Sequence, residues 1–288
     1  MNLLGIGAKH PACIRWSGFF TAGCLTLGVL LAACSGETCA TGASRALVLR
    51  CGQSLRDHFL DPRCPFYEEV DLRQAGLSAI RELIPLIGDG DARLRSRASA
   101  VLPYLAPIPG QAEVAHALLG ALPRERDAGV KINLVLAMSS LPSQAARVSP
   151  AIRALISAQE ENLCVRMAAA YGHWRLTLEE TAAAELFAWA LSAENSEVHE
   201  IAAHYLAEMG TFPRLLVKEV AAGLSHPVSQ AKYCFAVALG NVGPEAIGAT
   251  GSLEPLLDDR SGLVRDAAHS ALCKIHEGYM RPEWSRGR

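Results

Sequence analysis

The sequence predicts an all-α protein: an α-solenoid of about six helical hairpins, preceded by one leading helix. Three observations lead to this prediction, namely the composition, the apolar periodicity of residues 253–276, and the recurrence of that periodicity upstream. Half of the 288 residues are hydrophobic but only 6% are aromatic, so the core must consist mainly of aliphatic side chains and alanine. Leucine and alanine are both strong helix formers, which favours an all-helical core.

The segment 253–276 reads LEPLLDDRSGLVRDAAHSALCKIH and predicts one helical hairpin. Counted from Val264, apolar residues occur at +3, +4, +7, +8 and +11, which is one face of a helix. Leu253, Leu256 and Leu257 end a second apolar face. The polar turn 258–262 separates the two faces, as expected between paired helices.

The same pattern recurs five times upstream. The equivalent reference positions are separated by 36, 35, 33, 33 and 33 residues, and they are Leu94, Val130, Val165, Val198, Ala231 and Val264. A fixed period of this size is typical of a solenoid. The position three residues earlier holds a good N-cap in five units, namely Asp91, Asp127, Asn162, Asn195 and Ser261. In the fifth unit Pro227 can begin the helix instead.

The helix before each of these is expected to bury its own apolar face, the first through Leu77, Ile80, Ile84 and Ile87. Upstream of the array, apolar residues recur every fourth position from about Ala43 to Leu60, which predicts one leading helix ended by Asp61-Pro62. The expected organisation is a leader at 1–33, a lipidated N-terminus and tether at 34–43, the leading helix and a Cys-containing loop at 44–71, the repeats at 72–277, and a polar tail at 278–288.

Two stretches carry a family resemblance. The residues from Leu263 to Leu272 and from Ala238 to Gly243 resemble HEAT repeats, of the short type also found in phycobilisome-lyase-like proteins. The resemblance covers residues 72–277. It implies a right-handed superhelix with one face available to a partner, and a binding scaffold more than an enzyme.

The N-terminus predicts export and lipidation. Lys9 and Arg15 precede an apolar run at 16–33, which is typical of a signal peptide and too short for a confident membrane span. Leu31, Ala32 and Ala33 lead to Cys34, and this motif resembles the bacterial lipobox. The resemblance implies that Cys34 carries acyl chains and becomes the first residue after cleavage. The alternative is an ordinary secretory leader with an incidental cysteine.

The residue after Cys34 helps to predict whether the protein is retained in the inner or the outer membrane. In Gram-negative lipoproteins an Asp there favours the inner membrane, and this chain has Ser35. We therefore expect the outer membrane, with the protein facing either the periplasm or the cell surface. Because an exported chain can form disulfides, Cys51 and Cys64 are the candidate pair, and Cys39 could replace either. Cys164, Cys234 and Cys273 are expected to be separate, buried small hydrophobes.

A basic residue or histidine follows every reference position: Arg95, Lys131, Arg166, His199, Lys232 and Arg265. In HEAT proteins this position often forms a ladder with acidic turn residues, for which Asp91, Asp127 and Asp259 are the candidates here. The alternative is a stripe that binds an anionic ligand. The net charge of −2, which becomes −4 once Lys9 and Arg15 leave with the leader, argues against that stripe and against nucleic acid.

The sequence contains no convincing catalytic or metal-binding motif. His199 and His204 resemble a zinc-protease pair, but at i and i+5 they lie about 140° apart around a helix and cannot share a metal in the usual way. The His-Glu pairs at 199–200 and 276–277 do not occupy matching positions, as an iron-binding HEAT hydroxylase would require. His173 replaces an apolar residue at +8 and is expected to be a core histidine, with a functional role as the alternative.

We therefore expect a lipoprotein whose solenoid binds an unknown protein partner in the cell envelope, with no enzymatic activity, cofactor or metal. The competing prediction is a lyase-like assistant that holds a substrate in the solenoid groove. Clustered ionisable groups in the groove would favour the competing prediction.

Overall fold

The computed structural model describes residues 54–60, 72, 76–105, 108, 110–193, 195–210, 216–277 and 279, all within the compact unit Ala46–Arg288. Every regular element in these ranges is helical and none is a strand, which confirms the all-α prediction. None of the helices in this part of the chain is long and apolar enough to cross a bilayer.

The α-helices are α2 (Leu55–Leu60), α4 (Leu77–Ile87), α5 (Ala92–Val101), α6 (Gln111–Ala121), α7 (Ala128–Met138), α8 (Ala145–Ser157), α9 (Leu163–Thr177), α10 (Thr181–Ser192), α11 (Ser196–Glu208), α12 (Val217–Ala222), α13 (Ser229–Val242), α14 (Thr250–Leu253) and α15 (Gly262–Ile275). Short 3₁₀ helices connect or extend them at Leu102–Leu105, Leu122–Arg124, Pro142–Gln144, Gly223–Ser225, Gly243–Ala249 and Glu254–Asp258.

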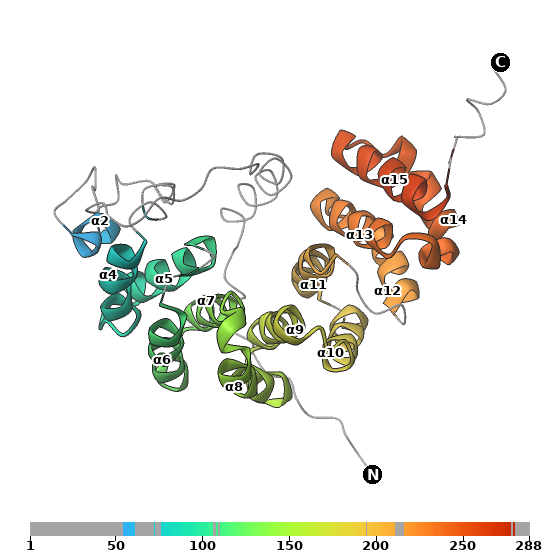
Figure 1. Cartoon of the computed structure of the whole chain (residues 1–288). Helices are drawn as coiled ribbons and strands as arrows, with labels where there is room; N and C mark the ends of the chain where they lie inside the picture. The colour runs from blue at the N-terminus through green and yellow to red at the C-terminus, as the bar shows by residue number, and fades with distance from the viewer. Residues whose placement is uncertain are drawn as a thin grey trace, which may run out of the picture. The chain divides into compact units, whose positions relative to one another are not determined.

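The helices pack in pairs along the chain, α4 with α5 and so on to α14 with α15 (Figure 1). The second helices of the pairs also pack on one another in chain order, from α5 through α7, α9, α11 and α13 to α15. We call these six helices layer B. The first helices (α4, α6, α8, α10, α12 and α14) form layer A, in which α4 packs on α6, α6 on α8, α10 on α12 and α12 on α14.

The core lies between the two layers. All six reference positions, Leu94, Val130, Val165, Val198, Ala231 and Val264, are buried. In layer A most of the residues expected on the apolar faces are buried, and the largest departure is in α4. Leu77 is exposed and Ile84 is half-buried, whereas Ile80, Leu83, Leu86 and Ile87 are buried. Leu77 is the first residue of α4, and its side chain extends beyond the pair toward Gly110 at the start of α6.

Only the end of the predicted leading helix lies within the described residues. The described helix α2 begins at Leu55, where the Oγ of Ser54 accepts the Asp57 N–H at 3.2 Å and donates to the Asp57 carboxylate at 2.8 Å. This local cap fixes the start of the helix at Ser54. Leu55 and Phe59 are buried, and α2 packs against both α4 and α5.

Four of the expected N-caps are confirmed. The side chains of Asp91, Asp127, Asn162 and Asn195 accept backbone N–H groups at the starts of α5, α7, α9 and α11. Ser261 was wrongly assigned, because it occupies the N-cap position of α15 but makes no capping bond. The carboxylate of Asp259 accepts the N–H of Ser261 itself, at 2.8 Å, and this bond does not reach the first N–H groups of α15.

Replacing Asn195 with alanine should lower the free energy of unfolding by about 1 kcal/mol, the usual value for a lost N-cap. Its side chain accepts the N–H groups of both Glu197 and Val198, at 2.9 and 3.3 Å. Ser261→Ala is the matched control and should change stability little, because Ser261 makes no such bond. Urea denaturation measures both. An equal loss in the two variants would show that capping by Asn195 contributes nothing.

Layer B is tightly packed at two glycines. A Cβ on Gly240 of α13 would lie 2.8 Å from the Cα of Ala271 on α15. A Cβ on Gly172 of α9 would lie 3.3 Å from Val135 on α7 and from Ser139, the residue that follows α7. Because glycine has no side chain, Gly240 and Gly172 allow neighbouring layer B helices to approach closely.

Cys164 and Cys234 are buried, as predicted. Cys273 is exposed, so the prediction of burial was wrong there. Its position on α15 is equivalent to that of Gly240 on α13, which meets the next layer B helix. No described helix follows α15, and so Cys273 has no such neighbour to bury it.

Candidate functional site

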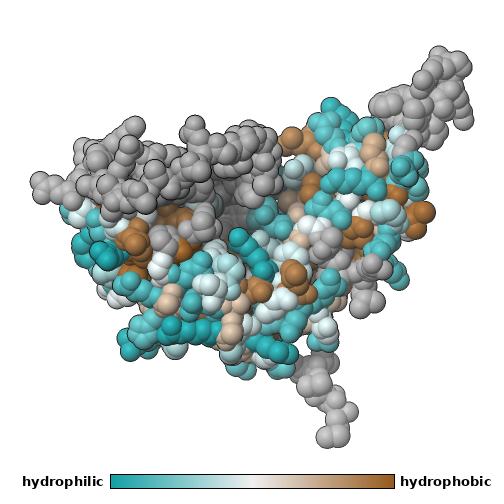
Figure 2. Space-filling model, in the orientation of Figure 1, coloured by the Kyte–Doolittle hydropathy of each residue, from teal (hydrophilic) through white to brown (hydrophobic). Residues whose placement is uncertain are grey.

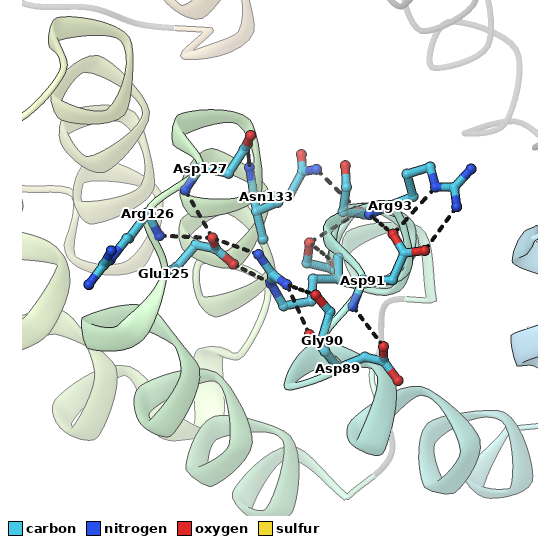
Figure 3. A network of polar contacts seen from close by, with 12 residues as sticks. Asp89, Gly90, Asp91, Arg93, Glu125, Arg126, Asp127 and Asn133 are labelled. Carbon is cyan, nitrogen blue, oxygen red and sulfur yellow. Dashed lines mark hydrogen bonds and ion pairs between the residues drawn. The ribbon is translucent and has the colours of Figure 1, made fainter.

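The repeated basic position links each helix pair to the next one. Arg95 on α5 donates from Nε and Nη2 to the carboxylate of Glu125, at 2.7 and 3.1 Å, in the turn that precedes α7. Its Nη1 donates to the carbonyls of Asp89 and Gly90 in its own turn, at 2.9 and 3.1 Å. Figure 3 shows this network. The guanidinium is thereby fixed between two turns.

Glu125 also closes its own turn. Its Oε1 accepts the N–H groups of Arg126 and Asp127, at 2.8 and 2.9 Å (Figure 3). Burial acts to raise the pKa of Glu125, but the bonds from Arg95 and from the two backbone N–H groups outweigh it and hold the pKa below its ordinary value. One carboxylate thus serves both the local turn and the contact with the preceding pair.

We call each such contact between a basic position and the following turn a rung. Lys131 pairs with Glu161, and Lys232 pairs with Asp259. Each carboxylate also accepts a backbone N–H of its own turn, from Asn162 and Ser261 respectively. These two rungs therefore repeat the Arg95–Glu125 arrangement.

The series extends upstream of the predicted array. Arg56 on α2 pairs with Asp89, whose carboxylate accepts the Asp91 N–H at 2.9 Å. Arg56 follows Leu55 as Arg95 follows Leu94, so α2 occupies the position of a further layer B helix. This rung was not predicted, because the leading helix was expected to lie outside the repeats.

At two junctions the basic position meets no carboxylate among the described residues. Arg166 donates from Nε to the Ile156 carbonyl at 3.1 Å, and its guanidinium lies 5.8 Å from the ring centroid of Trp189 on α10. This distance permits a cation–π contact. The ring of His199 lies 6.0 Å from that of His226, centroid to centroid. Trp189 is 54% exposed.

Arg265 has no described pair after it. Its Nη1 donates to the carbonyls of Asp259 and Arg260, at 2.8 and 3.2 Å. Arg95 makes the same two contacts with its own turn, six and five residues upstream. Arg265 therefore makes the contacts that Arg95 makes with its own turn, and no pair that could supply a carboxylate is described after it.

The acidic partners were only partly predicted. Asp259 is a rung partner, but Asp91 and Asp127 are N-caps, and Asp91 pairs with the exposed Arg93. Their short side chains are already engaged by the backbone of their own helices. The partners that were missed are Asp89, Glu125 and Glu161, which lie five or four residues before the reference position. A hydrogen-bond acceptor four or five residues before the reference position is the sequence feature that could have identified these partners.

A second cluster lies on α9 and α11. Tyr171 stacks on Tyr205 and on Trp174, with centroid distances of 5.1 and 6.2 Å. Burial raises the pKa of Tyr171, whereas the charge and the hydrogen bond of Arg175 act to lower it. Burial also raises the pKa of Tyr205.

Two ionisable groups on α11 border these rings. His204 lies 5.9 Å from Tyr205, and burial lowers its pKa to about 4. Desolvation raises the pKa of Glu208, whereas the charge of Arg175 acts to lower it. Glu208 is nevertheless an exposed residue. Tyr171 and Arg175 occupy the same repeat positions on α9 as His204 and Glu208 on α11. The repeat therefore places these ionisable groups side by side.

The histidines considered as possible site residues do not form one cluster. His173 is 2% exposed, burial lowers its pKa, and its Nδ1 lies 3.4 Å from Oγ1 of Thr177. His199 contacts His226, while His204 contacts Tyr205. Across the described residues, no three His, Cys, Asp or Glu side chains are placed to hold a metal ion.

Several predicted site residues lie outside the described residues. They are the lipobox residues Leu31, Ala32 and Ala33, the lipidation site Cys34, and the candidate disulfide partners Cys51 and Cys64.

Comparison with known proteins gives little beyond the geometry. No family model matches the chain, and no curated protein matches it. Among solved structures, the chain is similar to the crystal structure of an engineered protein, with 19% sequence identity and a TM-score of 0.39. The similarity covers 73% of this chain and 85% of the engineered one.

Proposed function

We propose that this protein is a membrane-anchored lipoprotein whose helix pairs form a HEAT-type solenoid that binds a protein partner in the cell envelope. The observation that carries the binding proposal is the contact between Arg166 and Trp189. Trp189 leaves 54% of its surface exposed beside a guanidinium 5.8 Å away. Tryptophan and arginine are the residues most enriched where protein interfaces derive their binding energy.

The rungs support the solenoid part of the proposal. Ion pairs at equivalent positions connect three of the pairs to the pair that follows, through Arg95–Glu125, Lys131–Glu161 and Lys232–Asp259. Contacts between nearest neighbours are what a repeat array requires. Such an array would hold exposed side chains at fixed spacings for a partner.

Photo-crosslinking in cells tests the binding proposal. A photoreactive residue replaces Trp189, and a second protein carries it at Ala154, an exposed position on α8. We expect one defined protein adduct from position 189 that is absent from position 154. Recovery of a co-purifying small molecule, with no protein adduct from position 189, would contradict the proposal.

The anchor has its own test. Cells labelled with a palmitate analogue should incorporate label into the wild-type protein and not into Cys34→Ala, which should also leave the membrane fraction. The reason is that two or more acyl chains anchor a protein stably, whereas a chain without them has no such anchor. Cys39→Ala is the matched control and should keep its label. Label that persists in Cys34→Ala would rule out the anchor.

The second candidate function is a lyase-like assistant that holds a substrate, and the cluster on α9 and α11 favours it. Desolvation shifts the pKa values of His204 and Glu208 in opposite directions, and such groups are common at sites that bind or transform small molecules. Co-purification of a ligand that is lost in Tyr171→Ala would support this candidate over the first.

A further inference from the structure

We propose that His269 and Cys273 on α15 form a binding site for a transition-metal ion such as Zn²⁺. The two residues are four apart in the helix, so their side chains lie on one face, one turn apart. The Sγ of Cys273 lies 3.9 Å from Nδ1 and 3.8 Å from Nε2 of His269. Cys273 is exposed and His269 is half-buried, so an ion in solvent can reach both side chains.

The separation of the donor atoms fits a metal that binds both of them. Zinc binds a thiolate at about 2.3 Å and an imidazole nitrogen at about 2.0–2.1 Å, and a tetrahedral angle between the two bonds puts sulfur and nitrogen about 3.6 Å apart. The 3.8 Å between Sγ and Nε2 is close to this value. A small rotation of the imidazole closes the difference without any movement of the helix.

The helix that carries the two ligands is held by its opposite face. The buried residues of α15 are Val264, Ala267, Ala268, Ala271, Leu272 and Ile275, and the helix packs on α13. Because this packing fixes the backbone, the spacing of His269 and Cys273 is set before a metal binds. Ligands on a rigid element lose less conformational freedom on binding.

The two positions are those at which other layer B helices meet their neighbours. Val135 and Ser139 occupy them in the α7 unit and face Gly172 of α9, whereas Gly240 occupies the second on α13 and faces α15. The equivalent pairs in the five earlier units contain neither His nor Cys: Ser99 and Pro103, Val135 and Ser139, Ala170 and Trp174, Ala203 and Ala207, Ala236 and Gly240.

Packing therefore does not account for an imidazole and a thiol at the end of the described array. No described helix follows α15, so Cys273 buries nothing against a neighbour of this kind. An exposed cysteine is usually retained for its reactivity or for metal binding and not for its packing.

The charges on this face of α15 favour a cation. Asp266, three residues before His269, is exposed. The two basic residues of the helix are engaged elsewhere. Lys274 donates to Oδ1 of Asn241 on α13 at 3.1 Å, and Arg265 donates to carbonyls of its own turn.

The donor types define the class of ion. Thiolate sulfur and imidazole nitrogen suit Zn²⁺ and chemically similar ions, whereas Mg²⁺ and Ca²⁺ prefer oxygen ligands. On binding, the Cys273 thiol loses its proton to solvent as the metal–sulfur bond forms. No third His, Cys, Asp or Glu among the described residues completes the set, so water or a donor from another molecule takes the remaining positions.

Titration of the purified, reduced full chain with Co²⁺ tests the proposal. A Co²⁺–thiolate bond gives a charge-transfer absorption band in the near ultraviolet. We expect this band to appear and saturate, and Zn²⁺ to remove it. The site requires neither the lipid anchor nor the protein partner proposed above, so its test is independent of theirs.

Two variants assign the ligands. Cys273→Ser should abolish the band. His269→Gln should weaken Co²⁺ binding at least tenfold, because even a residue that only supports a metal ligand is worth about 10- to 100-fold in affinity. Cys273→His should lose the band but keep Co²⁺ binding, measured by competition with a coloured chelator, since it places two imidazoles at the same spacing. Circular dichroism checks that each variant is folded.

The matched controls replace a histidine and a cysteine elsewhere. His116→Gln changes an exposed histidine on α6, and Cys39→Ser changes a cysteine outside the described residues. Both should keep the band. A wild-type protein without the band, a band that survives Cys273→Ser, or an unchanged affinity in His269→Gln would each overturn the proposal.

Discussion

Gly240→Ala should lower the free energy of unfolding by about 3 kcal/mol, at the upper end of the range for an overpacked core position. The added Cβ would lie 2.8 Å from the Cα and 3.1 Å from the Cβ of Ala271 on α15. The obstructing atoms belong to backbone and to a side chain without rotamers, so relief requires α13 and α15 to move apart. Urea denaturation followed by circular dichroism measures the loss.

Gly120→Ala is the control for that experiment. Gly120 also lies within a helix, α6, but a Cβ there would meet nothing within 4 Å. Alanine should stabilise this helix by up to about 1 kcal/mol relative to glycine. If both substitutions stabilised the protein equally, the close contact between α13 and α15 would be disproved.

Arg95→Met should cost about 3 kcal/mol, near the lower end of the range for breaking a buried ion pair from one side. The Glu125 side chain is 3% exposed and would remain without its guanidinium partner, whereas Arg95 keeps 21% of its surface in solvent. Arg93→Met is the control. Arg93 is 76% exposed in its pair with Asp91, so its removal should have little effect.

The loss in Arg95→Met should depend on pH. In the wild type the pKa of Glu125 is lowered by folding, so its contribution is present above the carboxyl's unfolded pKa and is lost as the pH falls through the folded value. Without Arg95, burial should instead raise the folded pKa. The difference between the two proteins should therefore shrink from pH 7 to pH 4.5 in urea denaturation. An equal difference at both values would show that Glu125 is not the group involved.

The sequence predicted the parts of this fold that depend on local chemistry. The 3.6-residue periodicity placed all six reference residues in the core, and the caps Asp91, Asp127, Asn162 and Asn195 were identified from residue type and spacing. Each of these features is determined within one helix. They could therefore be recognised without knowing how the pairs stack.

The rung partners could not be predicted in the same way. The acceptor that precedes the helix is Asp89, Glu125, Glu161, His226 or Asp259, so no single residue type marks it. Its significance appears only when the preceding pair brings a basic side chain to it, about one repeat away in sequence. Asp91 and Asp127 were the wrong choices because a carboxylate engaged as an N-cap is not available to the neighbouring pair.

The double role of the turn acceptors restricts where the chain can change length. Rung partners lie 30 residues apart in Arg95–Glu125 and Lys131–Glu161, but 27 apart in Lys232–Asp259. The acceptor itself stays four or five residues before the reference position throughout. Insertions and deletions are therefore tolerated between one pair and the next, where connections can loop outward. Between the acceptor and the reference position the spacing varies by only one residue, so a longer insertion there would uncouple the turn and the rung together. The loops between pairs are therefore the sites at which this chain can acquire new sequence.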